Sequence, residues 1–194
     1  DDIGGYAPFY PKRYGEYLHL AQYGPEKSFP DQFSRWTVFK NFGSPLFDLL
    51  NVKYVLLPPS VSVDDKNILL EYGGEITIFK NKSSFARTFF VPSYVYCSTQ
   101  ETALNLLGNF SHNDFKSTVI LEKRPPQGIG YKYDGFPQPV RASVEIVEYT
   151  SNRISLKVVS PQNGFIVLSD SYHPDWEALV DGKTSVVLRA NYIM

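Results

Sequence analysis

Residues 168–183, which read Leu-Ser-Asp-Ser-Tyr-His-Pro-Asp-Trp-Glu-Ala-Leu-Val-Asp-Gly-Lys, constrain the fold more than any other segment. An apolar strand runs into an aromatic turn and a second strand, and Asp181-Gly182 is a preferred pair for a tight hairpin turn. Upstream, residues 142–149 and 153–159 alternate apolar and polar side chains, which is the period of a sheet with one buried face. Turn residues separate these runs at short intervals. We therefore expect residues 140–194 to form an antiparallel β-sandwich that stops before its last strand.

The preceding part of the chain mixes helix and strand signals. Its first forty residues are rich in Tyr, Phe, Pro and Gly, and Ser44-Pro45 is a helix start because Ser caps well and Pro is tolerated at the first helical position. Ser98 or Thr99 is expected to cap a second well-marked helix. The expected helices cover residues 13–22, 45–50 and 101–107, and the expected strands cover 53–57, 68–72, 75–80, 85–91 and 118–122.

The chain then changes character. Residues 124–139 are rich in Pro and Gly and are expected to connect two regions. The predicted organisation is a mixed α/β region over 1–123, this connector, and the β-sandwich over 140–194. The predicted fold class is therefore α+β.

Composition excludes several classes of protein. The 43% hydrophobic and 20% charged content is that of a folded globular chain, and the net charge of -1 provides no basic field for a nucleic acid. A single cysteine and three scattered histidines indicate neither a metal site nor a disulfide framework, and we expect no cofactor. No apolar run approaches the roughly 20 residues that span a bilayer, so the segment itself is expected to be soluble.

Candidate ligand-binding residues gather near the end of the chain. Tyr172, His173 and Trp176 could form a platform for a sugar ring, although aromatic side chains are more often buried for their area. Arg189 and Asn191 could hold an anionic glycan or a lipid phosphate. The competing interpretation gives them a structural salt bridge or a hydrogen bond that pins a loop.

No arrangement of nucleophile, base and acid is recognisable, so no catalytic residue is predicted. A hydrolase would need two acids facing each other across a cleft, and the acids to check for that are Glu71, Glu75, Asp134 and Asp170. Cys97 is expected to be a small core residue. Asn81 and Asn109 begin sequences that fit the N-glycosylation pattern.

Several blocks of the chain resemble one known family. They are Asp-Ile-Gly-Gly-Tyr at 2–6, Pro-Lys-Arg-Tyr at 11–14, Ser-Pro-Leu-Phe-Asp-Leu-Leu-Asn-Val-Lys-Tyr-Val-Leu at 44–56, Ala-Arg-Thr-Phe-Phe-Val at 86–91, and the stretch from 168 to Arg-Ala-Asn-Tyr at 189–192. Together they resemble the extracytoplasmic C-terminal region of the YfhO family, which consists of multi-pass bacterial membrane proteins of glycosyltransferase C type. Two positions depart from the family pattern, because Gly4 stands where Arg is frequent and residues 173–175 where Tyr-Pro-Gly is frequent.

The resemblance implies a domain on the outer face of the bacterial membrane, attached to the membrane-embedded part of the same polypeptide. That part would use a lipid-linked sugar to decorate cell-surface polymers such as lipoteichoic acid, and its chemistry would lie outside this segment. The domain would help to position a teichoic-acid-like acceptor, another glycan or a partner protein. The alternative is a free-standing carbohydrate-binding or adhesion module with no membrane enzyme attached.

Overall fold

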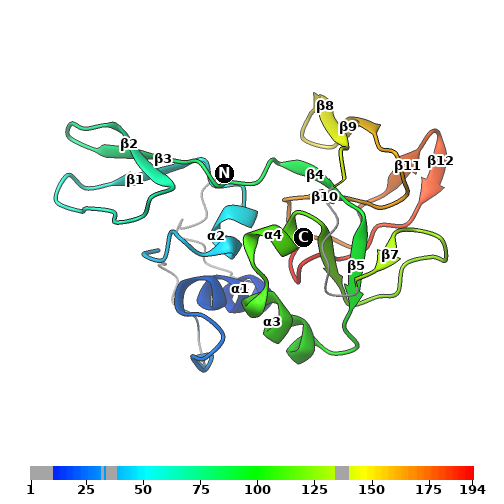
Figure 1. The fold of residues 1–194 in the computed structure, drawn as a ribbon, viewed down its shortest axis with the longest axis horizontal. Coiled ribbons are helices and arrows are strands. Elements are labelled where there is room, and N and C mark those ends of the chain that lie inside the picture. Colours follow the sequence, from blue (N-terminus) through cyan, green and yellow to red (C-terminus); the bar gives the residue numbers. More distant parts are fainter. Residues whose placement is uncertain (1–10, 32, 34–38, 134–139) are drawn as a thin grey trace. The chain divides into compact units, whose positions relative to one another are not determined.

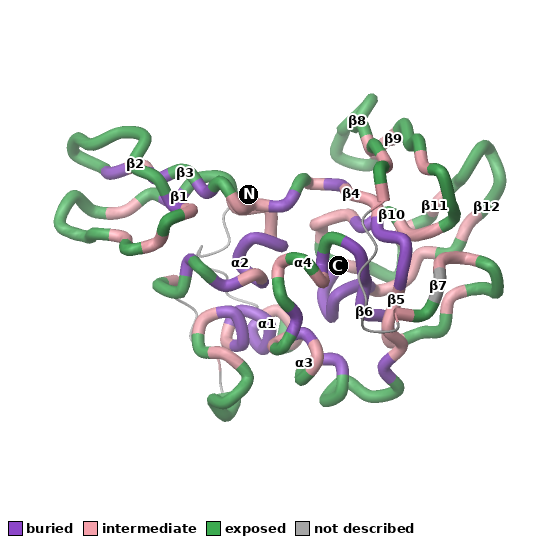
Figure 2. Tube along the Cα trace, viewed as in Figure 1, coloured by how far each residue is buried: buried purple, intermediate pink, exposed green. Residues whose placement is uncertain are grey.

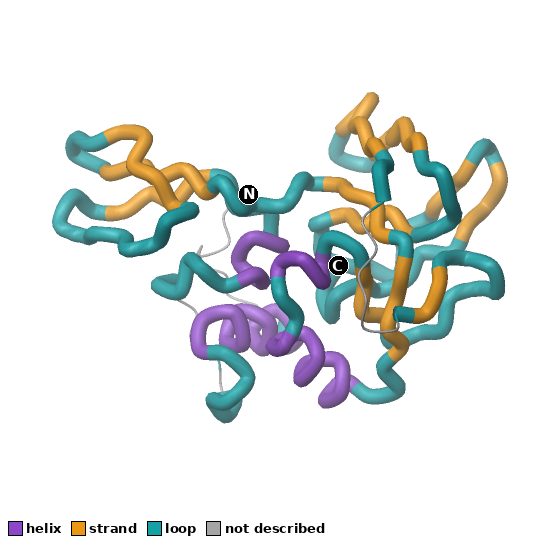
Figure 3. The backbone as a smooth tube through the Cα atoms, in the orientation of Figure 1, coloured by secondary structure: helices purple, strands orange, loops and turns teal. Residues whose placement is uncertain are grey.

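The structure is a computed structural model that describes residues 11–31, 33, 39–133 and 140–194 (Figure 1). The chain divides into two compact units, Asp1–Ala86 and Arg87–Met194. Helices and short sheets occur in both units, and most of the regular elements of the second unit are strands (Figure 3). The predicted α+β fold class is confirmed.

The described part of the first unit contains two helices and one sheet. Its elements are α1 (Lys12–Tyr23), α2 (Pro45–Leu49), β1 (Tyr54–Leu57), β2 (Ile68–Tyr72) and β3 (Thr77–Asn81). Helix α1 ends at Gly24, which adopts φ 77° and donates its N–H to the Leu20 carbonyl at 2.8 Å. The Tyr17 hydroxyl donates to the Leu46 carbonyl at 2.8 Å and so joins α1 to α2. Burial raises the pKa of Tyr17, which keeps this hydroxyl a donor.

The sheet of this unit has the strand order β1-β3-β2, and both pairings are antiparallel. Its inner face packs Val55, Ile68 and Phe79 against Phe42 and Phe47. Each buried aromatic ring contributes a large apolar area, so this cluster is the core of the unit. The predicted helix at 45–50 and the hairpin around Gly73-Gly74 are both confirmed, and the Ser44 hydroxyl accepts from the Leu46 N–H as expected of an N-cap.

A buried polar pair ties helix α2 to strand β3. The Asn81 amide donates to the Asp48 carboxylate at 2.8 Å, and both residues are at most 5% exposed. The Asn81 side-chain oxygen also accepts the Ser83 N–H at 2.9 Å. A hydrogen bond to a charged group is stronger than one between neutral groups, and so this pair stabilises the unit. Because Asn81 is buried, its glycosylation-type sequence has no accessible acceptor in the folded chain.

The second unit is built around a three-stranded parallel sheet. Its elements are β4 (Thr88–Val91), β5 (Ser93–Tyr96), α3 (Gln100–Asn109), α4 (His112–Phe115), β6 (Thr118–Leu121), β7 (Tyr131–Lys132), β8 (Ser143–Tyr149), β9 (Ile154–Val159), β10 (Phe165–Leu168), β11 (Ala178–Val180) and β12 (Lys183–Ser185). Strands β5, β6 and β7 run parallel in the order β6-β5-β7, and α3 and α4 connect β5 to β6. All four residues of β6 are buried (Figure 2). Thr99 caps α3, which confirms one of the two predicted caps.

The remaining strands form antiparallel pairs, β4 with β10, β8 with β9, and β11 with β12. The β11–β12 hairpin turns at Asp181 and Gly182, whose φ angles of 49° and 77° are those of the predicted tight turn. The β8–β9 and β11–β12 hairpins are largely exposed (Figure 2). Residues 134–139 of the predicted connector 124–139 lie outside the described residues, and the role of this segment as a connector stays a prediction.

The segment 190–194 packs against the edge of β6. Ala190 and Met194 exchange two backbone hydrogen bonds, at 2.5 and 2.8 Å, and close a small loop. Asn191 inside this loop pairs with Ile120, because its N–H donates to the Ile120 carbonyl at 2.9 Å and its side-chain oxygen accepts the Ile120 N–H at 3.0 Å. The amide side chain thus supplies the acceptor that a neighbouring strand would otherwise provide. Within the described residues, no helix is long and apolar enough to cross a membrane.

Candidate ligand-binding surface

The loop of residues 169–177 follows strand β10 and carries the sequence-predicted Tyr172 and Trp176. Backbone hydrogen bonds hold it at three points. Ser169 donates to the Arg87 carbonyl at 2.9 Å, Tyr172 to the Ile193 carbonyl at 2.7 Å, and Trp176 to the His173 carbonyl at 3.1 Å. The first two bonds join the loop to segments far away in sequence. The fold therefore fixes the backbone from which these aromatic side chains project.

Tyr172 is paired with Arg189. The guanidinium carbon of Arg189 lies 4.6 Å from the centre of the Tyr172 ring, and both side chains are half-buried. A cation over an aromatic face at this distance gains about 0.5–2 kcal/mol, depending on desolvation. The structure thus brings together two of the four residues that the sequence analysis selected.

A second arginine and tyrosine lie at the start of the same loop. The Arg87 guanidinium hydrogen-bonds the Asp170 carboxylate and the Tyr149 hydroxyl, the latter at 2.6 Å, and lies 5.4 Å from the Tyr149 ring centre. The side chains of Arg87 and Asp170 are only 22% and 23% exposed, so solvent screens their ion pair incompletely. We call Arg87, Tyr149, Asp170, Tyr172 and Arg189 the arginine–tyrosine surface.

Sequence reasoning did not assign Arg87 or Tyr149 to a site. They lie 62 residues apart and approach each other because β4, β8 and β10 bring their ends together. Tyr149 looks like the last residue of an ordinary alternating strand, and its 53% exposure is a tertiary property. In the sequence, Arg87 is notable only because it directly precedes an apolar strand. That position does not indicate which residue its side chain contacts.

The other two selected residues differ in their surroundings. Asn191 is only 1% exposed and its side-chain oxygen accepts the Ile120 N–H, as the loop-pinning alternative expects. Trp176 is half-buried at the end of the turn that His173 begins. The expectation that either residue contacts a ligand stays a prediction.

The acids that a hydrolase would require are distributed over both units. Glu71 in the first unit forms an ion pair with Lys80 at 3.9 Å, and Asp170 in the second is paired with Arg87. Asp134 lies outside the described residues. The part of the chain that is described contains no group of three potential metal ligands. Cys97 is buried, as predicted, and burial together with the nearby Glu122 raises the pKa of its thiol.

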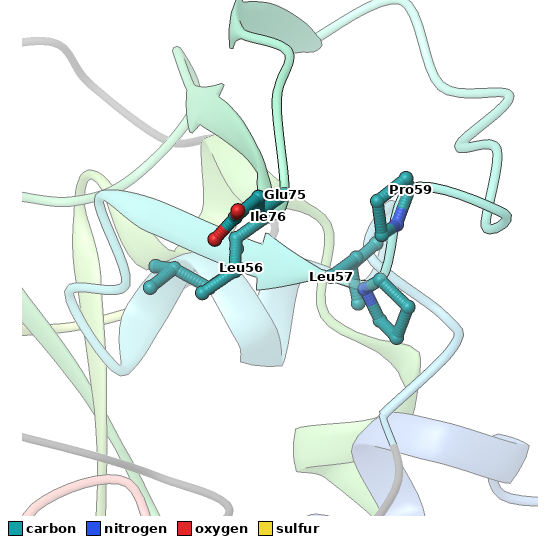
Figure 4. Close-up of a pocket in the computed structure, with 6 residues that line it drawn as sticks. Leu56, Leu57, Pro59, Glu75 and Ile76 are labelled. Atoms are coloured by element: carbon teal, nitrogen blue, oxygen red, sulfur yellow. The ribbon is translucent and has the colours of Figure 1, made fainter.

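The first unit has a shallow apolar pocket of about 370 Å³ at the end of β1 (Figure 4). Its lining comes from the end of β1, the following Pro58-Pro59 turn, and the two residues before β3, and consists of Leu56, Leu57, Pro58, Pro59, Glu75 and Ile76. Glu75 is the single acid of this lining. One carboxylate beside aliphatic side chains offers neither a paired acid and base nor a metal site.

His19 makes the first unit sensitive to acid. Its ring lies against the rings of Tyr23 and Phe29, with centroids 4.7 and 5.3 Å away, and burial lowers its pKa below 6.5, aided by the charge of Lys27. The unfolded chain therefore binds a proton more readily than the folded one. We expect stability to fall as the pH drops through about 6.5, and urea titrations at several pH values should show that His19→Leu reduces this slope. An unchanged slope in the variant would contradict the assignment.

No protein-family model, curated protein or solved structure matches this chain.

Proposed function

We propose that the chain is a non-catalytic extracytoplasmic domain of a bacterial multi-pass, glycosyltransferase-like membrane protein, and that it helps to position a cell-surface polymer acceptor or a partner. The proposal rests on the resemblance of its sequence blocks to the YfhO family. Its membrane-embedded partner would be the rest of the same polypeptide, where the sugar transfer would occur.

The observation that carries the binding role is the pairing of Arg189 with Tyr172, which belongs to a loop whose backbone is hydrogen-bonded to distant segments at Ser169 and Tyr172. A ring with an apolar face and polar groups at its rim suits a pyranose, which is apolar on one face and hydroxylated at its edge. A preorganised loop also loses less conformational entropy on binding than a mobile one.

A free-standing carbohydrate-binding or adhesion module is the second candidate, because the same surface would serve it equally well. The coding sequence on either side separates the two. Many flanking apolar spans favour the membrane protein, whereas a secretion signal without such spans favours the free module.

The binding role is tested by titrating the isotope-labelled chain with oligosaccharides and teichoic-acid fragments while following the amide and indole signals. We expect shifts clustered at Tyr172, Trp176 and Arg189 at millimolar ligand, and Tyr172→Ala to weaken binding about 10-fold, because about 1.4 kcal/mol of ring contact is lost. Tyr72→Ala is the matched control, since Tyr72 is 57% exposed but belongs to the first unit. Equal weakening by both variants, or no shifts at all, would contradict the binding role.

A further inference from the structure

The charges around the arginine–tyrosine surface do not favour a polyanion. Loop 169–177 carries the carboxylates of Asp170, Asp175 and Glu177, and two arginines, Arg87 and Arg189, contact its residues. The charge of Arg87 is balanced by Asp170 in an ion pair, and Arg189 faces the ring of Tyr172. A chain of phosphates would therefore meet more negative than positive charge, and like charges lower both affinity and association rate.

The polar groups suit hydroxyls instead. A sugar hydroxyl both donates and accepts, and the cluster combines a carboxylate acceptor at Asp170 with a hydroxyl at Tyr149, both hydrogen-bonded by the Arg87 guanidinium. The ion pair holds the carboxylate in one orientation, so it loses little freedom when a ligand binds. Tyr149 is 53% exposed, which leaves its ring accessible to a ligand.

Asp170 and Tyr172 are close along the chain. They are two residues apart, and two residues of extended chain span at most about 7 Å, so their Cα atoms lie no farther apart than one or two sugar rings. Two tyrosine rings of the arginine–tyrosine surface each pack with a planar cation. Tyr172 packs with Arg189, and Tyr149 packs with Arg87.

We infer that the arginine–tyrosine surface binds an uncharged pyranose residue of a glycan and not a polyanionic chain, with Asp170 and Tyr149 hydrogen-bonding its hydroxyls and Tyr172 contacting its apolar face. The inference rests on the proposed binding function and narrows it to one chemical class of ligand.

The test uses the complete chain and titrates it with maltohexaose, cellohexaose, poly(glycerol phosphate) and inorganic phosphate. We expect the neutral hexasaccharides to shift the signals of Tyr149, Asp170 and Tyr172, with a dissociation constant that does not change between low and physiological ionic strength. Binding of poly(glycerol phosphate) that weakens with salt, without binding of the neutral sugars, would overturn this inference but leave the proposed function standing. No binding of any probe would overturn both.

Two variants assign the binding to these residues. Asp170→Asn removes the carboxylate charge, and Tyr149→Phe keeps the ring but removes its hydroxyl, so the second variant remains informative if the first unfolds. We expect each to weaken neutral-sugar binding about 10-fold, because the first exchanges a charged acceptor for a weaker neutral one and the second removes a hydroxyl. The control is Glu148→Gln, which removes an exposed carboxylate next to Tyr149 that pairs with Arg153. Wild-type affinity in both test variants would overturn the assignment.

Discussion

Replacing Asn191 with Ala is expected to destabilise the chain by about 3 kcal/mol, measured by urea unfolding, because two costs combine. The side-chain oxygen of Asn191 accepts the Ile120 N–H at 3.0 Å, and its removal leaves a buried donor of β6 without this acceptor. Asn191 also has φ 46°, in the left-handed region that Asn tolerates better than Ala.

Asn191→Gly separates the two costs. Glycine adopts positive φ without strain but lacks the amide, so we expect it to lose less stability than the alanine variant and still more than an exposed substitution. If Asn191→Ala unfolds within about 0.5 kcal/mol of wild type, as a surface substitution does, the structural role is wrong. In that case Asn191→Ala could be used to test ligand binding, because a loss of binding could not be explained by a loss of folding.

Replacing Asn81 with Leu is expected to destabilise the first unit by about 3–4 kcal/mol, although leucine has a similar size. The substitution removes a donor from the buried Asp48 carboxylate and an acceptor from the Ser83 N–H. A buried polar group that loses its hydrogen-bond partner remains removed from water without compensation, and this lowers the free energy of unfolding.

Asn109→Leu is the matched control for that experiment. Asn109 also begins an Asn-X-Ser sequence, but it is exposed at the end of α3. Thermal or urea unfolding of the two variants should therefore differ by about 3 kcal/mol, since exposed substitutions have small effects. Equal stability of the two variants would show that the buried pair contributes little.

Local signals in the sequence predicted much of the fold. Ser44-Pro45 marked the start of α2, Gly73-Gly74 the β2–β3 hairpin, and Asp181-Gly182 the β11–β12 turn. In each case the signal resides in adjacent residues whose backbone preferences act at short range. The strand β5 was not anticipated, because it follows β4 after the single residue Pro92, and short apolar runs give no internal boundary. Its parallel pairing with β6 depends on contacts about 25 residues apart.

The candidate site was predicted in part. Tyr172 and Trp176 were selected as an aromatic platform for a sugar ring, and Arg189 and Asn191 as possible partners of an anionic glycan or lipid phosphate; the structure pairs Arg189 with Tyr172. Arg87 and Tyr149 were not selected, since each has ordinary neighbours along the chain.

The sequence by itself determined the local elements, the turns and the α+β class, because backbone propensity and hydrophobic period act over a few residues. Only the tertiary structure decided which polar groups meet. The contacts of Arg87 with Tyr149 and Asp170, and of Asn191 with Ile120, join residues 62 to 83 positions apart. Such contacts depend on how β4, β6, β8 and β10 are arranged. Many residues of the chain have compatible side chains, so the sequence alone does not indicate which of them meet.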